Sequence, residues 1–244
     1  MDFNKVKPYN QEEEKTAQLS RMFNSISGQY DKFNDIMSWG MARIWRRKSL
    51  LALKAYNPKQ ILDIATGTAD MCVKAFKFLQ PEHVTGIDIS EKMMEVGRMK
   101  LTEANLSDKV DLQVQDVSSM TFEDNTFDAA TIAFGIRNFE RLDQSLQEIH
   151  RVLKSGGHLL IVEMNEPQKG VLLWAYKLYI RLYVRTTTQL LSTDREAYSY
   201  LTASMQAFPN GEKLIAIMQQ NGLIKKKYRR FLFGVCSMYL MEKH

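Results

Sequence analysis

The chain has 244 residues and a mass of 28.3 kDa, enough for one full domain or two small ones. Its 45% apolar and 25% charged residues are typical of a globular protein and exclude disordered, collagen-like and coiled-coil classes. The net charge of +5 is mildly basic. With two cysteines, no signal-peptide pattern at Met1 and no run of 18 apolar residues, the sequence predicts a reduced, cytoplasmic protein without a membrane span.

Residues 1–56 are predicted to be helical and to form a lid or substrate-binding region. A first helix is indicated by apolar residues at helical spacing, namely Leu19, Met22, Phe23 and Ile26. A second helix is expected from Asp35 to Tyr56, because Pro58 disfavours helical backbone in the residue before it.

Residues 57–244 are predicted to form an α/β domain. Short apolar runs that are typical of buried strands occupy 61–65, 83–88, 110–115, 127–134 and 158–163, with helical patterns at 69–79, 91–104 and 142–153 between them. Such alternation predicts βαβ units and a parallel sheet. A helical insertion is expected at about 167–205, followed by a helix at 211–221 and strands near 224–230 and 232–241.

Acidic residues and one glycine follow the first three predicted strands. The first strand leads into the loop from Asp63 to Asp70, in which Gly67 is the only glycine, so the dinucleotide fingerprint is missing and a nicotinamide oxidoreductase is disfavoured. Asp88 ends the second strand, where an acid accepts hydrogen bonds from ribose hydroxyls, and Asp116 follows the third. Strand ends converge in such sheets, so the pattern predicts a nucleoside without a pyrophosphate, of which S-adenosyl-L-methionine is a common example.

These segments together resemble class I S-adenosylmethionine-dependent methyltransferases, and more narrowly the ubiquinone/menaquinone biosynthesis C-methyltransferase family. The resemblance covers most of residues 20–240. Its residues are Tyr30-Asp31-x-x-Asn34-x-x-Met37-Ser38-x-Gly40-x-x-Arg43-x-Trp45-Arg46, Asp63 to Asp70, Asp124 to Asp128, Phe134-Gly135-Ile136-Arg137-Asn138, Arg151 to Gly157, Tyr198-x-Tyr200-Leu201 and Gly234-Val235-Cys236. It implies a Rossmann-like fold with a seven-stranded, mostly parallel sheet, helices on both faces and an N-terminal helical lid.

The resemblance also implies the cofactor contacts. They fall on Thr68, Asp88 and the Asp116–Val117 pair, with Asp63 and Gly67 in the same loop. Asp63 is expected either to contact the cofactor or to organise the loop. Ala133 stands where the family often has a serine, and Ala65 stands where a first glycine is usual, so this chain loses one cofactor hydrogen bond at position 133.

The implied reaction is methyl transfer to a ring carbon of a reduced polyprenyl quinol, with demethylmenaquinol preferred over a ubiquinone-pathway benzoquinol. Loss of a proton from the quinol, whose hydroxyl has a pKa of about 10, activates the carbon. Arg137 is expected to stabilise the resulting anion, because a cation lowers the pKa of a neighbouring acid. Asn138 would help to hold a proton-carrying water, and Tyr30 would donate a hydrogen bond to a quinol oxygen.

The partners are less constrained. Segment 169–195 has five basic residues against one acidic residue, interleaved with aromatic residues and leucines, which is typical either of an anionic membrane surface at the inner face of the cell membrane or of a packed helix with a solvated basic stripe. A homodimer stays open. An oxygen- or nitrogen-directed small-molecule methyltransferase is the other enzyme reading. A nucleic-acid-binding protein is disfavoured, because a base-reading aromatic set is missing.

Overall fold

The computed structural model describes residues 3–167, 170, 173–174, 178–179 and 195–244. Its centre is a seven-stranded sheet in the order β3-β2-β1-β4-β5-β7-β6. The strands are β1 (Gln60–Ile64), β2 (His83–Asp88), β3 (Val110–Val114), β4 (Phe127–Ala133), β5 (Leu153–Met164), β6 (Leu223–Phe231) and β7 (Cys236–Lys243). β1 to β5 pair in parallel, and β7 is antiparallel to both β5 and β6. The seven-stranded, mostly parallel sheet is thereby confirmed.

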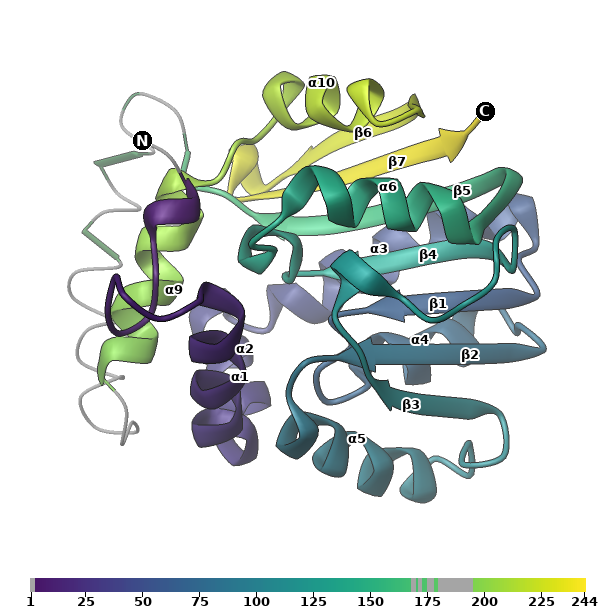
Figure 1. Cartoon of the computed structure of the whole chain (residues 1–244), viewed down its shortest axis with the longest axis horizontal. Helices are drawn as coiled ribbons and strands as arrows, with labels where there is room; N and C mark the ends of the chain where they lie inside the picture. The colour runs from purple at the N-terminus through teal and green to yellow at the C-terminus, as the bar shows by residue number, and fades with distance from the viewer. Residues whose placement is uncertain (1–2, 168–169, 171–172, 175–177, 180–194) are drawn as a thin grey trace.

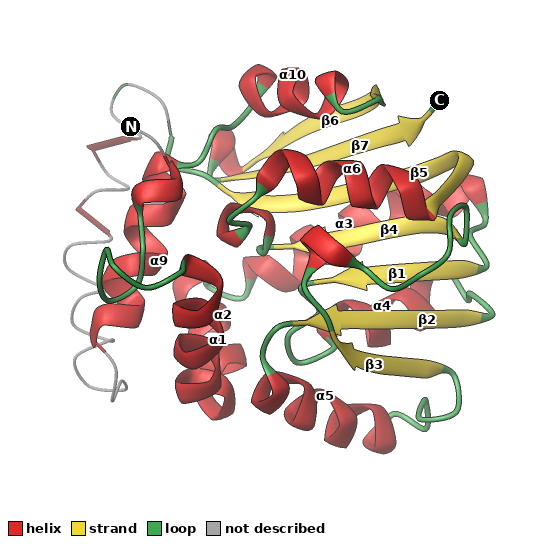
Figure 2. Cartoon of the chain, viewed as in Figure 1, coloured by secondary structure: helices red, strands yellow, loops and turns green. Residues whose placement is uncertain are grey.

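Helices cover both faces of this sheet (Figures 1 and 2). The described helices are α1 (Lys15–Ile26), α2 (Tyr30–Ser38), α3 (Met41–Leu53), α4 (Asp70–Phe78), α5 (Glu91–Glu103), α6 (Leu142–Val152), α9 (Arg195–Ala207) and α10 (Glu212–Gln220). One buried cluster packs α6 and α10 against the sheet, and a second packs α3 and α4 against its other face. The central strands β1, β2 and β4 and the second half of β5 are buried on both sides, which explains why their sequences are mostly apolar, whereas β3 and β6 at the edges of the sheet are more exposed.

The predicted helix 35–56 is wrong as a single element, because two helices meet at Trp39 and Gly40. Both residues have positive φ, 50° and 71°, a conformation that ends a helix and that glycine adopts without strain. The hydroxyl of Ser38 bridges the break, since it donates to the carbonyl of Asn34 and accepts from the amide of Ala42. The following α3 buries Ala42, Trp45 and Leu50 against the sheet. It therefore belongs to the α/β body.

The N-terminal helices α1 and α2 lie beside α9, over the end of the sheet at which the parallel strands finish (Figure 1). A third buried cluster joins Leu19 and Met22 of α1 to Met93 of α5 and to Ala197 and Tyr200 of α9. The term lid is kept below for residues 15–38, which comprise α1 and α2. Most of the predicted insertion at 167–205 lies outside the described residues. Within the described part, no helix is long and apolar enough to cross a bilayer.

Candidate active site

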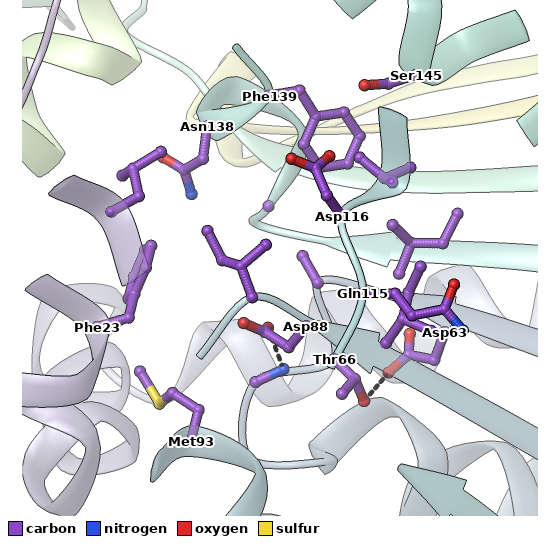
Figure 3. Close-up of a pocket in the computed structure, with 18 of the residues that line it drawn as sticks. Phe23, Asp63, Thr66, Asp88, Met93, Gln115, Asp116, Asn138, Phe139 and Ser145 are labelled. Carbon is purple, nitrogen blue, oxygen red and sulfur yellow. Dashed lines mark hydrogen bonds between the residues drawn. The ribbon is translucent and has the colours of Figure 1, made fainter. Parts of the chain in front are cut away.

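A cavity of about 260 Å³ lies between the lid and the carboxyl ends of β1 to β4 (Figure 3). Predicted site residues on its wall are Tyr30, Asp63, Gly67, Thr68, Asp88, Asp116, Val117 and Asn138. Arg137 is the one predicted residue that is not on this wall. The loops after four neighbouring strands bring these residues together, as expected for ligand sites in open α/β sheets. Within the described residues, no group of His, Cys, Asp and Glu side chains is placed to hold a metal ion.

The loop after β1 alternates between right- and left-handed backbone. Ala65, Gly67 and Ala69 have φ of 54°, 55° and 59°. Two of these residues are alanines, for which left-handed backbone costs roughly 1–2 kcal/mol each. The amides of Thr66, Gly67 and Ala69 donate to Ile87, Asp88 and Thr66, so these hydrogen bonds hold the loop in this conformation beside the cavity.

Asp63 holds this loop in place. Its carboxylate accepts hydrogen bonds from the hydroxyls of Thr131 and Thr66, both at 2.6 Å, and from the thiol of Cys72 at 3.5 Å. The side chain is only 1% exposed, and burial raises its pKa although all three donors oppose the shift. Because three side-chain donors engage its oxygens and the residue is almost fully buried, whereas Asp88 is partly exposed, Asp63 fits the loop-organising alternative.

Asp88 is placed to bind a ribose. Its carboxylate accepts from the amides of Gly67 and Ser90, both at 2.9 Å (Figure 3). Burial raises its pKa to about 6, and the charge of nearby Asp63 acts in the same direction, while the two amide donors lower it. The carboxylate faces a cavity beside β2, where acceptors for ribose hydroxyls lie in this kind of fold.

Asp116 and Val117 form the neighbouring wall. Asp116 precedes a short helical turn, η4 (Val117–Ser119), and accepts from the amide of Ser118 at 2.8 Å. Val117 is buried and supplies an apolar surface. A flat nucleoside base between this wall and Asp88 would contact the apolar side chain of Val117 and would have the carboxylate of Asp116 at its polar edge. The cavity thus offers a polar ribose position and a partly apolar base position, which fit S-adenosylmethionine.

Thr68 contacts the lid in this structure. Its hydroxyl donates to Asp31 of α2 at 2.8 Å and accepts from Lys100 of α5 at 2.8 Å, and Lys100 also forms an ion pair with Asp31. The side chain is 2% exposed. Thr68 therefore connects the cofactor loop to the lid, in addition to lining the cavity.

Arg137 lies behind the cavity. It is 5% exposed, and one of its terminal nitrogens donates to Glu163 at 2.5 Å and to the carbonyl of Phe134 at 2.7 Å. Burial opposes its charge and is the largest single effect, but Glu163, Tyr30 and Tyr200 together outweigh it and raise the pKa of Arg137. The Nε atom has no hydrogen-bond partner. Arg137 therefore stays cationic, with its charge largely balanced.

Asn138 extends into the cavity from the turn η5 (Ile136–Asn138). Its amide oxygen accepts from the hydroxyl of Tyr200 at 3.0 Å, so its nitrogen points toward the cavity interior (Figure 3). Tyr30 lines the same cavity and packs edge-on against Phe23. Tyr30 from the lid and Asn138 from the turn after β4 thus line the same cavity.

Sequence reasoning assigned no role to Glu163, Tyr200 or Arg46, although Tyr200 and Arg46 lie in the quoted motifs. Glu163 neutralises Arg137 from 26 positions away, and Tyr200 orients Asn138 from helix α9. Arg46 of α3 lines the cavity and is 7% exposed. The available signal for Arg46 was a charged residue in a helix that packs against the sheet. Charged residues that become buried in this way are almost always paired.

Comparisons with known proteins agree with this geometry. The model of the ubiE/COQ5 methyltransferase family matches residues 10–243. A demethylmenaquinone methyltransferase of Bacteroides fragilis is 44% identical over 98% of this chain and 98% of its own. The ubiquinone/menaquinone biosynthesis C-methyltransferase UbiE of Pseudomonas entomophila is 32% identical over 93% and 90%. A solved S-adenosylmethionine-dependent methyltransferase from Aquifex aeolicus superposes with a TM-score of 0.56 at 16% identity, covering 76% of this chain and 82% of its own.

Proposed function

Because the chain belongs to the ubiE/COQ5 methyltransferase family, we propose that it methylates a ring carbon of reduced demethylmenaquinol, with S-adenosylmethionine as the methyl donor. The observation that carries this acceptor is the 44% identity, over nearly the whole chain, to a protein named demethylmenaquinone methyltransferase. A benzoquinol acceptor is the second candidate, because the Pseudomonas entomophila relative carries a name that covers the ubiquinone pathway as well.

The cavity residues divide the cofactor between them. Asp88 accepts from the ribose hydroxyls, Val117 and Asp116 flank the base, and the loop around Gly67 faces the methionine part. When bound, S-adenosylmethionine supplies an electrophilic methyl group. The protein has to place a nucleophilic carbon in line with that methyl, and such positioning can lower the barrier by several kcal/mol.

The polar end of the cavity, formed by Tyr30 and Asn138 with Arg137 behind them, activates the acceptor. The amide nitrogen of Asn138 and the hydroxyl of Tyr30 donate to the quinol oxygen as it loses its proton. The cation of Arg137 lies directly behind them and favours the anionic oxygen, although Glu163 weakens that field. Arg137 is a poor base, because its own pKa is raised further. The proton leaves through a water held by Asn138.

The acceptor is tested with labelled S-adenosylmethionine and product mass. Reduced demethylmenaquinol is expected to gain one methyl group, whereas the oxidised quinone gains none because it lacks the nucleophilic carbon. Side-by-side rates with naphthoquinol and benzoquinol acceptors of equal tail length decide the ring. Turnover of the benzoquinol alone would contradict the preferred acceptor.

The roles of Arg137 and Asn138 are tested by single-turnover methylation. Asn138→Ala and Arg137→Ala are each expected to lower kcat by roughly 10²–10³, the effect of removing a preorganised stabilising group. Arg137→Ala also leaves Glu163 buried without its partner, which destabilises a fold by about 3–5 kcal/mol. Arg137→Met/Glu163→Gln removes both charges and therefore separates chemistry from folding. A folded double variant with an undiminished rate would exclude a role for the Arg137 charge.

We further propose contact with an anionic membrane surface through 169–195, most of which lies outside the described residues. Two of its described apolar residues, Trp174 and Leu178, are 67% and 39% exposed. Together with the basic residues of the segment, they suit a lipid interface. Co-sedimentation with vesicles containing phosphatidylglycerol is expected to exceed that with phosphatidylcholine vesicles. Trp174→Ala should reduce it, and equal binding to both vesicle types would contradict the proposal.

A further inference from the structure

Arg46 is a buried cation on the wall of the cofactor cavity. It is 7% exposed, and its guanidinium lies 4.8 Å above the ring centroid of Phe134. One terminal nitrogen is 3.1 Å from the carboxylate of Asp70. The Nε atom is buried and has no hydrogen-bond partner. Buried donors of charged groups are rarely left unpaired, so this N–H points to an acceptor that the protein itself does not supply.

Asp70 does not fully neutralise Arg46, because it also pairs with Lys74 at 2.7 Å. Arg46 therefore shares this carboxylate with a second cation, and the buried carboxyl of Asp63, which also interacts with Arg46, is already engaged by the hydroxyls of Thr131 and Thr66. The other arginine on the wall, Arg141, is exposed and immediately precedes α6, which packs against η4 near Asp116. Of the two arginines on the wall, the one next to the β1 and β4 ends is therefore Arg46.

The order of the strands indicates which group of the bound cofactor accepts the hydrogen bond from Arg46. Asp116 follows β3, Asp88 ends β2, and the loop with Gly67 follows β1, so base, ribose and methionine positions run along the sheet in the order β3, β2, β1. The next strand is β4, which is followed by Phe134 beneath Arg46. The far end of the cofactor therefore arrives at Arg46, and that end carries a carboxylate.

We propose that Arg46 binds the methionine carboxylate of S-adenosylmethionine. The Nε–H and a terminal N–H form one edge of the planar guanidinium, which matches the two oxygens of a carboxylate. Phe134 holds the guanidinium plane from one side, and Asp70 fixes it from another. This role rests on the cofactor of the proposed reaction and is independent of which quinol is the acceptor.

The test uses isothermal titration without any acceptor, so that it reads cofactor binding alone. S-adenosylmethionine is compared with its decarboxylated form, which keeps the adenosine, sulfonium, methyl and amine groups. The wild-type chain is expected to prefer the carboxylated form by about 10- to 100-fold, the value of a charge-assisted contact. Arg46→Met should weaken the binding of S-adenosylmethionine by that factor and leave the affinity for the decarboxylated form unchanged or higher. Arg46→Lys should recover part of the preference.

Asp88→Asn is the matched control, because it should weaken both ligands and leave their ratio as in the wild type. Unchanged affinity of Arg46→Met for the decarboxylated form shows that the variant is folded. The proposal is overturned if Arg46→Met weakens both ligands equally, which indicates a structural role, or if it keeps the wild-type preference. A variant that binds the cofactor normally but fails only with the quinol would also overturn it, and would move Arg46 to the acceptor site.

Discussion

At the scale of single residues, the site depends on carboxylates in different protonation environments. Asp63 is buried among hydroxyl donors and serves the loop, whereas Asp88 faces the cavity with a pKa raised to about 6. The same side chain type therefore has a structural role on β1 and a proposed binding role on β2. The difference comes from what each carboxylate contacts.

The pKa of Asp88 predicts pH-dependent cofactor binding. Because the folded-state pKa is raised to about 6, the carboxylate is ionised above that pH and becomes protonated below it. Ribose hydroxyls donate best to the ionised form, so affinity should fall by up to about tenfold per pH unit below 6. Titration calorimetry between pH 5 and 8 measures this fall. Asp88→Asn should bind more weakly and lose the pH dependence, and a wild-type affinity that is flat over this range would contradict the assignment.

Gly135 packs against Ala65 so closely that no space is left for a side chain at position 135. A Cβ at position 135 would lie 2.6 Å from the Cβ of Ala65, and the next atom, in Ile132, would be at an ordinary 3.5 Å. Gly135→Ala is therefore expected to destabilise the fold by about 1–3 kcal/mol, the usual cost of overpacking. In an Ala65→Gly background the same substitution should cost much less. Urea unfolding of the four variants measures the coupling, and additive effects would contradict this steric explanation.

At the scale of elements, the lid is fastened to the loops that carry the site. Glu140, two residues after Asn138, accepts from the amides of Lys15 and Thr16 at the start of α1. Asn24 accepts from Ser90 and from the amide of Lys92 at the start of α5. Together with the Asp31–Thr68–Lys100 contact, these bonds link the start of α1, the end of α1 and the start of α2 to the loops after β4, β2 and β1. A rearrangement of one of these loops on ligand binding would therefore affect the lid through these hydrogen bonds.

This linkage predicts lid protection on binding. Amide exchange in 15–38 should slow when cofactor and a quinol analogue bind together, because the loops that anchor the lid become ordered. Lys100→Met removes the ion pair with Asp31 and should speed exchange in α2. Arg98→Met is the matched control on the same helix, since Arg98 pairs with Glu91, outside the lid. If amide exchange in α2 were equal in the two variants, the contact of Lys100 with Asp31 would not stabilise the lid.

The strands and the acids that follow them could be predicted because buried parallel strands have continuous apolar sequences and their ends converge. The break at Trp39 could not, because tryptophan is an unusual residue for left-handed backbone. The pairing of Arg137 with Glu163 and the contact of Thr68 with Asp31 join residues 26 and 37 positions apart. Such partners depend on packing between elements, which local patterns do not encode.

At the scale of the whole molecule, the cavity joins all three buried clusters. Its wall includes Leu19 from the α1 cluster, Met71 from the α4 side of the sheet and Phe139 from the α6 side. A ligand in this position stabilises contacts that hold the sheet, its helices and the lid together. The lid shares its buried surface with α5 and α9, so it is not expected to unfold as a separate unit.

This arrangement predicts a single thermal transition that shifts as a whole with the cofactor. S-adenosylhomocysteine at one hundred times its Kd should add about 2.7 kcal/mol to the free energy of unfolding by mass action. For a chain of this length, each kcal/mol corresponds to about 2–4 °C, so the transition should rise by roughly 5–10 °C. Differential scanning calorimetry measures the shift, and Asp88→Asn at the same ligand concentration should show a smaller one. Two transitions, of which only one responds to the ligand, would mean that the lid and the α/β body are independent folding units.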